Sequence, residues 1–296
     1  MVSDPSTFRD RPVSFVRRNG RMTDGQERAW TDLAARYVLD APRDDAATSV
    51  RPGAAIDPRE VWGRDAPLIV EIGSGQGHAI IHAAVSRPEA DFLAIEVFTA
   101  GLARTMLGAE RAAVENLRLV EANAPEVLEH LLPPASVDEL WVFFPDPWHK
   151  NKHTKRRLVT PEFATTAAGA VRDGGTLRLA TDWEQYARQM REVLDAAPEF
   201  ERAFAGEWAD RFDGRVLTAF ERKGARAGRA IRDLSYIRQR RECASRRTRH
   251  PLRWRVHGRA RRATAGGSSA HSRTGTSARC SPRSCCRSSP PGCGPL

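Results

Sequence analysis

Short apolar runs alternate with helical patterns between residues 68 and 195 of this 296-residue chain. The apolar runs, typical of strands, are 68–72, 91–97, 116–122, 137–144 and 176–182. The stretches with helical periodicity are 78–87, 98–113, 125–132, 161–172 and 183–195. Apolar strands spaced by helices predict an α/β fold, with a parallel sheet and helices on both of its faces. Residues 216–224 also have strand character, and we expect them to add an antiparallel edge or hairpin.

The two ends of the chain differ from this central part. Residues 1–60 are polar, with Arg, Asp and Pro throughout, and predict a partly flexible N-terminal extension. Thr23 and Gln26 have the spacing of a capping box, which predicts a helix that starts at Thr23. Residues 61–240 form the predicted main domain. Residues 241–296 are rich in Arg, Ser, Pro and Gly without apolar periodicity, which predicts a disordered tail.

The formal net charge of +10 comes entirely from the end of the chain. Fifteen Arg residues and a single acid, Glu242, lie from Arg238 onward, so the 47 basic and 37 acidic residues of the whole leave 32 and 36 before that point. The domain is slightly acidic, and any sign of nucleic-acid binding has to be local. The composition of the tail is typical both of a disordered RNA-binding arm and of GC-rich DNA translated out of frame.

Cysteine usage and hydropathy bear on the compartment. All five cysteines lie in the tail, so nothing in the domain indicates an oxidising compartment, and no paired CxxC spacing suggests zinc. No run approaches the roughly 18 apolar residues of a membrane span, and the N-terminus lacks the apolar core of a signal peptide. We therefore expect a cytoplasmic protein with no membrane contact and no obligatory protein partner.

A glycine-rich loop follows the first predicted strand. Gly73, Gly75 and Gly77 lie in "VEIGSGQGHAI", where glycines let the backbone turn sharply and approach a ligand. Glu96 ends the next strand, at the place where an acid would accept hydrogen bonds from ribose hydroxyls. Glu71, just before the loop, suits a cationic ligand better than a pyrophosphate. The pattern favours S-adenosylmethionine over NAD as the ligand. The alternative for the glycine loop is a plain strand-to-helix turn, and the alternative for Glu71 is an acid that pairs with a nearby Arg.

Polar residues also follow the third and fourth strands. Asn123 stands where an amide could pair with the amine of an adenine, although an Asx-type turn before a helix fits almost as well. Asp146 lies between Pro145 and Pro147, which should keep Phe144 and Asp146 extended. The Asp146 carboxylate would then be fixed at the carboxyl end of the sheet, where open α/β sheets bind ligands. The alternative is an acid that only caps a proline-rich turn.

Five bases follow within eleven residues of Asp146 and have no acid among them. They are Lys150, Lys152, Lys155, Arg156 and Arg157. Such a run suits contacts to RNA phosphates, which set affinity and register without reading sequence. The alternative is a solvated charged loop. Trp148 is either a wall of the pocket or ordinary packing.

Residues 143–157, "FFPDPWHKNKHTKRR", closely resemble the signature of the tRNA (guanine-N7) methyltransferases, a class I S-adenosylmethionine-dependent family. The similarity runs from about residue 14 to residue 237 and includes, in the expected order, "SFVRRNGRMT", "VEIGSGQGHA", "AIEV", "ATDW" and "TAFERKG". The resemblance implies a Rossmann-like fold with a mostly parallel seven-stranded sheet and an antiparallel C-terminal strand. It also implies methyl transfer from S-adenosylmethionine to N7 of a tRNA variable-loop guanine, position 46, with a possible tRNA contact from residues 1–60.

The resemblance also assigns roles to individual positions. Glu71, Glu96, Asn123 and Asp146 match cofactor-contacting positions, and Asp146 also matches the catalytic one. The positions that match substrate contacts are Lys150, Asp182, Thr218, Ala219, Phe220 and Glu221. The family usually has an acid where Asn123 stands and a base at Ala219, so this chain departs from the pattern at these two positions.

The chemistry of guanine N7 agrees with a carboxylate in this role. N7 carries a lone pair and no proton, so its methylation needs no general base, and the product is a cationic purine. A fixed carboxylate such as Asp146 can orient the base through its N–H groups and offset charge that develops on the ring.

The sequence leaves several alternatives open. Asp182-Trp183-Glu184-Gln185 also has the pattern of a capping box, so Asp182 could simply cap a helix. His78 and His82, like His149 and His153, are four residues apart but lack the context of a metal site, and we predict no metal. The sequence also fits two other functions. One is a methyltransferase for another base or a small molecule, and the other is a non-catalytic RNA-binding protein.

Overall fold

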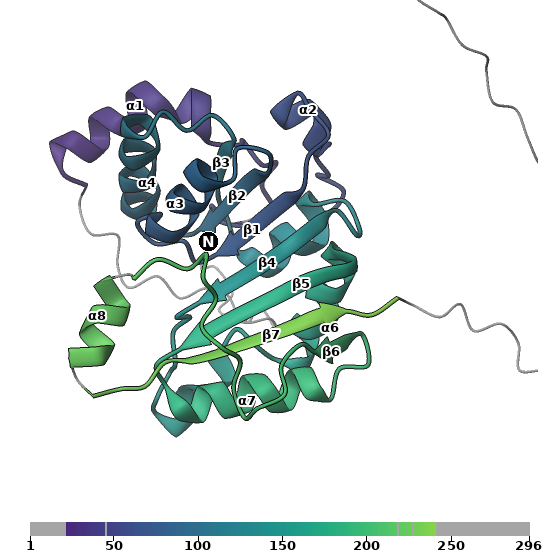
Figure 1. Ribbon diagram of the computed structural model, residues 1–296. Helices are drawn as coiled ribbons and strands as arrows, with labels where there is room; N and C mark the ends of the chain where they lie inside the picture. Colours follow the sequence, from purple (N-terminus) through teal and green to yellow (C-terminus); the bar gives the residue numbers. More distant parts are fainter. Residues whose placement is uncertain (1–21, 45, 218, 227, 241–296) are drawn as a thin grey trace, which may run out of the picture. The chain divides into compact units, whose positions relative to one another are not determined.

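The computed structural model describes residues 22–44, 46–217, 219–226 and 228–240, in which seven strands form one sheet (Figure 1). The strands are β1 Leu68–Ile72, β2 Asp91–Glu96, β3 Leu117–Glu121, β4 Val137–Phe143, β5 Val171–Thr181, β6 Phe200–Arg202 and β7 Arg232–Arg238. Their order is β3-β2-β1-β4-β5-β7-β6. Strands β1 to β5 are parallel, and β7 is antiparallel to β5 and β6. The predicted fold class is therefore confirmed.

Helices cover both faces of this sheet. The α-helices are α1 Asp24–Tyr37, α2 Pro58–Trp62, α3 His78–Ser86, α4 Thr99–Arg111, α5 Ala124–Glu126, α6 Pro161–Ala170, α7 Glu184–Asp195 and α8 Ala219–Arg226; η1 Val127–Leu131 is a π-helix and η2 Asn151–Arg156 a 3₁₀-helix. Side chains of α1, α3 and α4 form one buried cluster with Ile69 of β1, whereas η1, α6 and α7 form another with Leu68 and Val70. Successive residues of β1 thus face opposite layers, which is why the whole strand is apolar apart from Glu71.

The strand order reverses next to β1. From β1 the chain moves outward to β2 and β3, and then returns to place β4 on the other side of β1. In this pairing Ile72 lies opposite Val142, so the residues after β1 and those after β4 leave the sheet side by side. Such a reversal is the point at which parallel α/β sheets bind ligands.

Most predicted elements are found within a few residues of their predicted bounds, with β5 beginning five residues earlier than expected. The prediction of a strand at 216–224 is wrong, because Ala219–Arg226 forms α8. Ala, Glu, Arg and Lys in this segment favour a helix, and the β-branched residues that suggested a strand precede it. The antiparallel strand is β7 instead.

The helix predicted to start at Thr23 is confirmed as α1. Its capping box is complete, because the Gln26 N–H donates to Thr23 Oγ1 at 3.3 Å and the Thr23 N–H donates to Gln26 Oε1 at 2.9 Å. Tyr37 at its other end is buried and donates to the Val114 carbonyl at 3.2 Å. Residues on both sides of position 60 therefore share one core. The predicted boundary between an N-terminal extension, residues 1–60, and the main domain, residues 61–240, stays a prediction. Residues 1–21 and the predicted tail at 241–296 lie outside the described residues.

Among the described helices, none has the length and apolar composition that crossing a membrane would require.

The third glycine of the loop after β1 holds α3 against α4. Gly77 has a φ of +76°, and a Cβ at this position would lie 2.4 Å from Thr105 Cγ2. Gly77→Ala should therefore lower the free energy of unfolding by about 1–3 kcal/mol, since both the backbone and the contact become strained. Urea denaturation would measure this loss.

Gly169→Ala is the matched control. Gly169 lies in α6, and a Cβ there would meet nothing within 4 Å, so the substitution should raise stability by about 0.5–1 kcal/mol through helix propensity. Equal stability of the Gly77→Ala variant and the unsubstituted protein would contradict the packing described for this loop.

Candidate active site

The loop after β1 leaves an open space above its first two glycines. Gly73 and Gly75 have φ values of +72° and +59°, and a Cβ at either position would meet nothing within 4 Å. The Gly73 N–H donates to the Ile95 carbonyl of β2 at 2.8 Å, which fixes the start of the loop. The turn is therefore tight on the protein side and unobstructed on the other, as a closely approaching ligand requires.

Glu71 is a buried acid without a counter-charge. The residue is 4% exposed, and its Oε2 has no hydrogen-bond partner among the described residues. Burial, and secondly the charge of Glu96, raise the pKa of Glu71 to about 8, although a hydrogen bond from the Ile80 N–H acts in the opposite direction. The alternative that Glu71 pairs with an Arg is not borne out among the described residues. An ionised Glu71 needs a cation from outside this part of the protein.

Ser74 is a second buried polar group at the same place. Its Oγ also lacks a partner among the described residues. Two unpartnered polar atoms beside one open loop are unusual, because buried polar groups are normally hydrogen-bonded. They fit a ligand that carries both a positive charge and hydrogen-bonding groups. Sequence reasoning missed Ser74, since a small polar residue between glycines is ordinary in any turn.

Glu96 ties the glycine loop to the end of β2. One carboxylate oxygen accepts the Gly75 N–H at 2.8 Å, and the other accepts the N–H groups of Val97 and Phe98 at 2.7 and 3.0 Å. A carboxylate has about four acceptor positions, so one is left over for a ligand hydroxyl. The predicted ribose contact stays a prediction, and the visible role of Glu96 is to hold the loop.

Asn123 is buried at the start of α5. Its side chain does not cap the helix, contrary to the Asx-type alternative, and donates instead to Glu126 Oε1 at 3.1 Å. The Asn123 N–H donates to the Thr48 carbonyl at 2.7 Å, and Glu126 Oε2 accepts the Val50 N–H at 2.8 Å. Asn123 and Glu126 thus join the segment before α2 to the exit of β3.

The exit of β4 carries Asp146 in a constrained loop. The Phe144 N–H still donates to the Ala180 carbonyl of β5 at 2.8 Å, but Phe144 has a φ of +52° and Trp148 a φ of +41°. The prediction that Phe144 stays extended is therefore wrong, because the chain turns away from the sheet at this residue. Positive φ values at two non-glycine residues cost about 1–3 kcal/mol each. The exposed Asp146 lies between these two strained positions.

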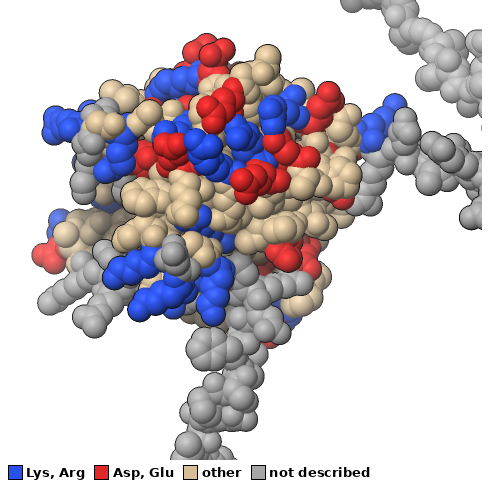
Figure 2. Space-filling model, turned by 90° about the horizontal axis from the view of Figure 1, so that it is seen from below, with Lys and Arg blue, Asp and Glu red and all other residues tan. Residues whose placement is uncertain are grey.

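Most of the predicted basic run is exposed, and one of its members packs on Trp148. Lys150, Lys152 and Lys155 are exposed, and Arg156 places its guanidinium carbon 5.2 Å from the centroid of the Trp148 ring. Trp148 is half-buried and packs against η2, which favours the packing alternative. Figure 2 shows that on one face Lys and Arg side chains gather in a patch without Asp or Glu among them, whereas elsewhere on this face both signs are mixed.

Arg157 does not lie with the other bases. It is 2% exposed, and its guanidinium donates to the Pro147 carbonyl and to the side chains of Gln189 and Gln185. The structure therefore corrects the expectation that Arg157 is available to RNA.

Asp182 does not cap a helix. The N-cap of α7 is Trp183, without a side-chain hydrogen bond, so the capping-box alternative is wrong. Asp182 Oδ2 instead accepts a hydrogen bond from Arg229 Nε at 2.7 Å, and a Cβ on Gly224 of α8 would lie 3.0 Å from the same oxygen. Asp182 is thus the point at which the end of β5 meets α8.

Glu221 of α8 is buried and paired rather than open to a substrate. Its carboxylate lies 2.6 Å from Arg215 Nη1 and 3.3 Å from Arg211 Nε. Arg215 is fully buried and also donates to Asp233 of β7 at 2.8 and 2.9 Å. Its guanidinium carbon is 5.4 Å from the centroid of the Phe144 ring, so this ion-pair cluster reaches the exit of β4.

The remaining predicted substrate residues lie around the start of α8. Thr218 is outside the described residues, and Ala219 and Phe220 open the helix. Sequence reasoning missed Arg215, since a single Arg before an apolar stretch gives no sign of burial.

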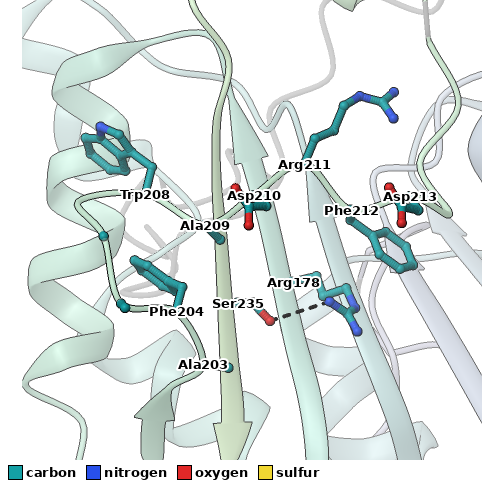
Figure 3. A pocket seen from close by; sticks show the side chains of 12 residues that line it. Arg178, Ala203, Phe204, Trp208, Ala209, Asp210, Arg211, Phe212, Asp213 and Ser235 are labelled. Atoms are coloured by element: carbon teal, nitrogen blue, oxygen red, sulfur yellow. Dashed lines mark hydrogen bonds between the residues drawn. The ribbon is translucent and has the colours of Figure 1, made fainter.

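A cavity of about 540 Å³ lies elsewhere, over β5 and β7 (Figure 3). Its lining includes Arg178, Phe204, Trp208, Phe212 and Ser235 and contains no predicted site residue. Arg178 crosses its floor, where it approaches Ser235 Oγ at 3.5 Å. None of its lining residues belongs to the exits of β1 and β4, which form the candidate site.

Comparison with known proteins agrees with this geometry. A family model described as "Putative methyltransferase" matches residues 65–234. The tRNA (guanine-N(7)-)-methyltransferase of Paenarthrobacter aurescens (strain TC1) is 46% identical over 278 residues, which cover 78% of this chain and 92% of that protein.

Two further similarities extend the comparison. The enzyme of the same name from Cutibacterium acnes (strain DSM 16379 / KPA171202) is 46% identical over 228 residues, covering 76% of this chain and 83% of that protein. Among solved structures, the 16S rRNA methyltransferase KamB has a TM-score of 0.48 and 16% identity, covering 62% of this chain and 92% of that one. From the family model and the curated relatives, the chain belongs to the tRNA (guanine-N(7)-)-methyltransferase family.

Proposed function

We propose that this protein transfers a methyl group from S-adenosylmethionine to N7 of guanine 46 in the variable loop of tRNA. The observation that carries the proposal is the adjacency of two exits: β1 leads to the uncompensated Glu71 and an open glycine loop, and the neighbouring β4 leads to Asp146 and the bases of η2. The names of the relatives support the choice of tRNA and of guanine N7.

The residues at the exit of β1 fit S-adenosylmethionine. Glu71 would offset positive charge on the ligand, Gly73 and Gly75 would allow its close approach, and Glu96 and Asn123 would receive its nucleoside part. When bound, S-adenosylmethionine supplies an electrophilic methyl group. The fit rests on the buried, unpartnered oxygens of Glu71 and Ser74 beside the open loop.

The residues at the exit of β4 would act on the guanine. Asp146 is exposed at the rim, where its carboxylate would accept hydrogen bonds from the N–H groups of the base and offset the positive charge that methylation leaves on the ring. Guanine N7 has no proton to lose, so this role needs no proton transfer. Lys150, Lys152, Lys155 and Arg156 would hold tRNA phosphates and set the register of the base.

Product analysis tests the proposal directly. The full-length protein is incubated with an unmodified tRNA transcript and methyl-labelled S-adenosylmethionine, and the tRNA is then digested to nucleosides. We expect labelled 7-methylguanosine at position 46, and no label in a transcript that carries adenine there. Label in another nucleoside, or at another position, would contradict the proposed substrate.

The pKa of Glu71 makes cofactor binding depend on pH. Because the pKa of about 8 lies above neutral pH, Glu71 is mostly protonated in the ligand-free protein below pH 8, and a cationic ligand must displace that proton. Affinity for S-adenosylmethionine should therefore rise between pH 6 and pH 8, by at most about tenfold per pH unit. Calorimetry in buffers of different ionisation enthalpy would detect the proton released.

Glu71→Gln is the matched variant, since it keeps the shape and removes the titration. Its affinity should be low throughout, and any remaining pH dependence belongs to the ligand's own amino group. A Glu71→Gln variant with the same pH dependence as the unsubstituted protein would remove Glu71 from the site.

Substitution of Asp146 and substitution of the exposed bases should change different kinetic parameters. Asp146→Asn keeps the shape and removes the charge, so turnover at saturating tRNA should fall by about 10²–10³-fold, while affinity for tRNA holds or rises. The triple variant Lys152→Ala, Lys155→Ala, Arg156→Ala should instead raise the half-saturating tRNA concentration. It should also flatten the log–log salt dependence by about one unit per lost phosphate contact. Steady-state kinetics at several salt concentrations separates the two.

Full turnover of Asp146→Asn would make Asp146 a structural turn residue. An unchanged salt slope of the triple variant would make the basic run a solvated surface.

A further inference from the structure

Arg157 ends the basic run in sequence, but its surroundings differ from those of every base before it. The side chain is buried and makes three hydrogen bonds: Nε–H to the Pro147 carbonyl at 2.8 Å, Nη1–H to Gln189 Oε1 at 2.6 Å, and Nη2–H to Gln185 Oε1 at 3.2 Å. Its guanidinium carbon also lies 4.9 Å from the centroid of the Tyr186 ring. Two of the five N–H donors of the guanidinium are not used in these bonds, but the side chain is buried and does not reach a phosphate outside.

All three acceptors of Arg157 are neutral. A buried cation without a carboxylate partner is costly, because its hydration is lost and no opposite charge replaces it. Arg nevertheless keeps its proton in such places. Selection for stability alone would not favour this arrangement, so its value should lie in what the guanidinium holds in place.

One end of the Arg157 contact is the loop that carries Asp146. Pro147, whose carbonyl accepts the Nε–H, stands between Asp146 and Trp148, and the φ of +41° at Trp148 is strained. Strained backbone persists only where its surroundings determine it strongly. The hydrogen bond from Arg157 directly restrains the peptide group between Pro147 and this strained residue, one residue after Asp146.

The other end of the contact is α7. Gln185 and Gln189 are four residues apart and therefore share one face of the helix. Gln189 also donates to the Val159 carbonyl at 3.1 Å, and the Val159 N–H donates to Tyr186 Oη at 3.0 Å. Residues 157–159 are thus fastened to α7, which packs in the core beneath the sheet. Arg157 connects this rigid helix to the loop.

We infer that Arg157 is a positioning residue for Asp146, and that it does not contact RNA. Its planar guanidinium holds the Pro147 carbonyl at a fixed distance from α7, so that the Asp146 carboxylate is presented to the base in one position. The role of Asp146 in this inference rests on the proposed function. The restraint on the loop does not.

The test compares neighbouring arginines in one segment. Arg157→Lys keeps the charge, but a single ammonium cannot reproduce the three hydrogen bonds that the planar guanidinium makes. It should lower turnover at saturating tRNA by about 10–100-fold, since small misplacements of a reacting group are that costly, and leave the salt slope of tRNA binding unchanged. Arg156→Gln should do the reverse: the half-saturating tRNA concentration rises and the salt slope falls by about one unit.

A second variant and a second measurement guard against simple misfolding. Gln185→Leu with Gln189→Leu removes the helix end of the contact and leaves Arg157 in place, and it should lower turnover in the same direction. Hydrogen exchange of the peptide spanning residues 144–150, followed by mass spectrometry, should become faster in Arg157→Lys and in the double variant. It should stay unchanged in Lys155→Gln, which alters an exposed base of the same segment. Thermal melting and affinity for S-adenosylmethionine report whether each variant is folded.

The outcomes separate this inference from the proposed function. Unchanged exchange of the 144–150 peptide in Arg157→Lys would overturn the restraint, whatever the activity. A salt slope that falls by one unit in Arg157→Lys would show a phosphate contact and overturn the inference as well. Absence of 7-methylguanosine with the unsubstituted protein would overturn the proposed function, while the exchange measurement would still decide the restraint.

Discussion

The parallel pairing of β1 with β4 is the constraint on which the candidate site depends. Because Ile72 lies opposite Val142, the glycine loop and the loop of Asp146 leave the sheet as neighbours, although more than sixty residues separate them in the chain. The connections on either side of this pair run over opposite faces of the sheet, which leaves the carboxyl ends of the two strands accessible. A ligand at one exit therefore lies within reach of groups at the other.

Charge is distributed unequally around these exits. Glu71 is buried without a positive partner among the described residues, whereas Arg215 is buried with two acids, Glu221 and Asp233. An ionised Glu71 needs a cation, whereas the charge of Arg215 is paired, although its Nε and Nη1 lack a hydrogen-bond partner among the described residues. The Arg215 pairs fix α8 to β7. Removing one member of the Arg215 cluster would leave an uncompensated buried charge, which is strongly destabilising. The candidate site thus combines one buried acid without a counter-charge among the described residues with one cluster whose charges are paired.

The sequence predicted the layers well, because periodicity reports which face of an element is buried. It failed where contacts between distant residues decide the outcome. The alternation in 216–224 is too short to distinguish a strand from a helix, and proline rules could not foresee the turn at Phe144. Arg156 and Arg157 are the same residue type at adjacent positions, but Arg156 is half-exposed and Arg157 is buried. Only the packing of α7 against the loop of Asp146 makes this difference. Likewise, no local pattern marks Glu221 as the partner of Arg215.

If the proposed function is right, the exits of β1 and β4 together form one methyltransferase site. The most direct measurement is a crystal structure of the protein with S-adenosylhomocysteine bound. We predict that the ligand lies above Gly73 and Gly75 with its amino group within hydrogen-bonding distance of Glu71 Oε2, and with its sulfur facing the loop of Asp146. A ligand bound instead in the cavity lined by Arg178 and Phe212, with Glu71 Oε2 still unpartnered, would contradict a methyltransferase site at these two exits.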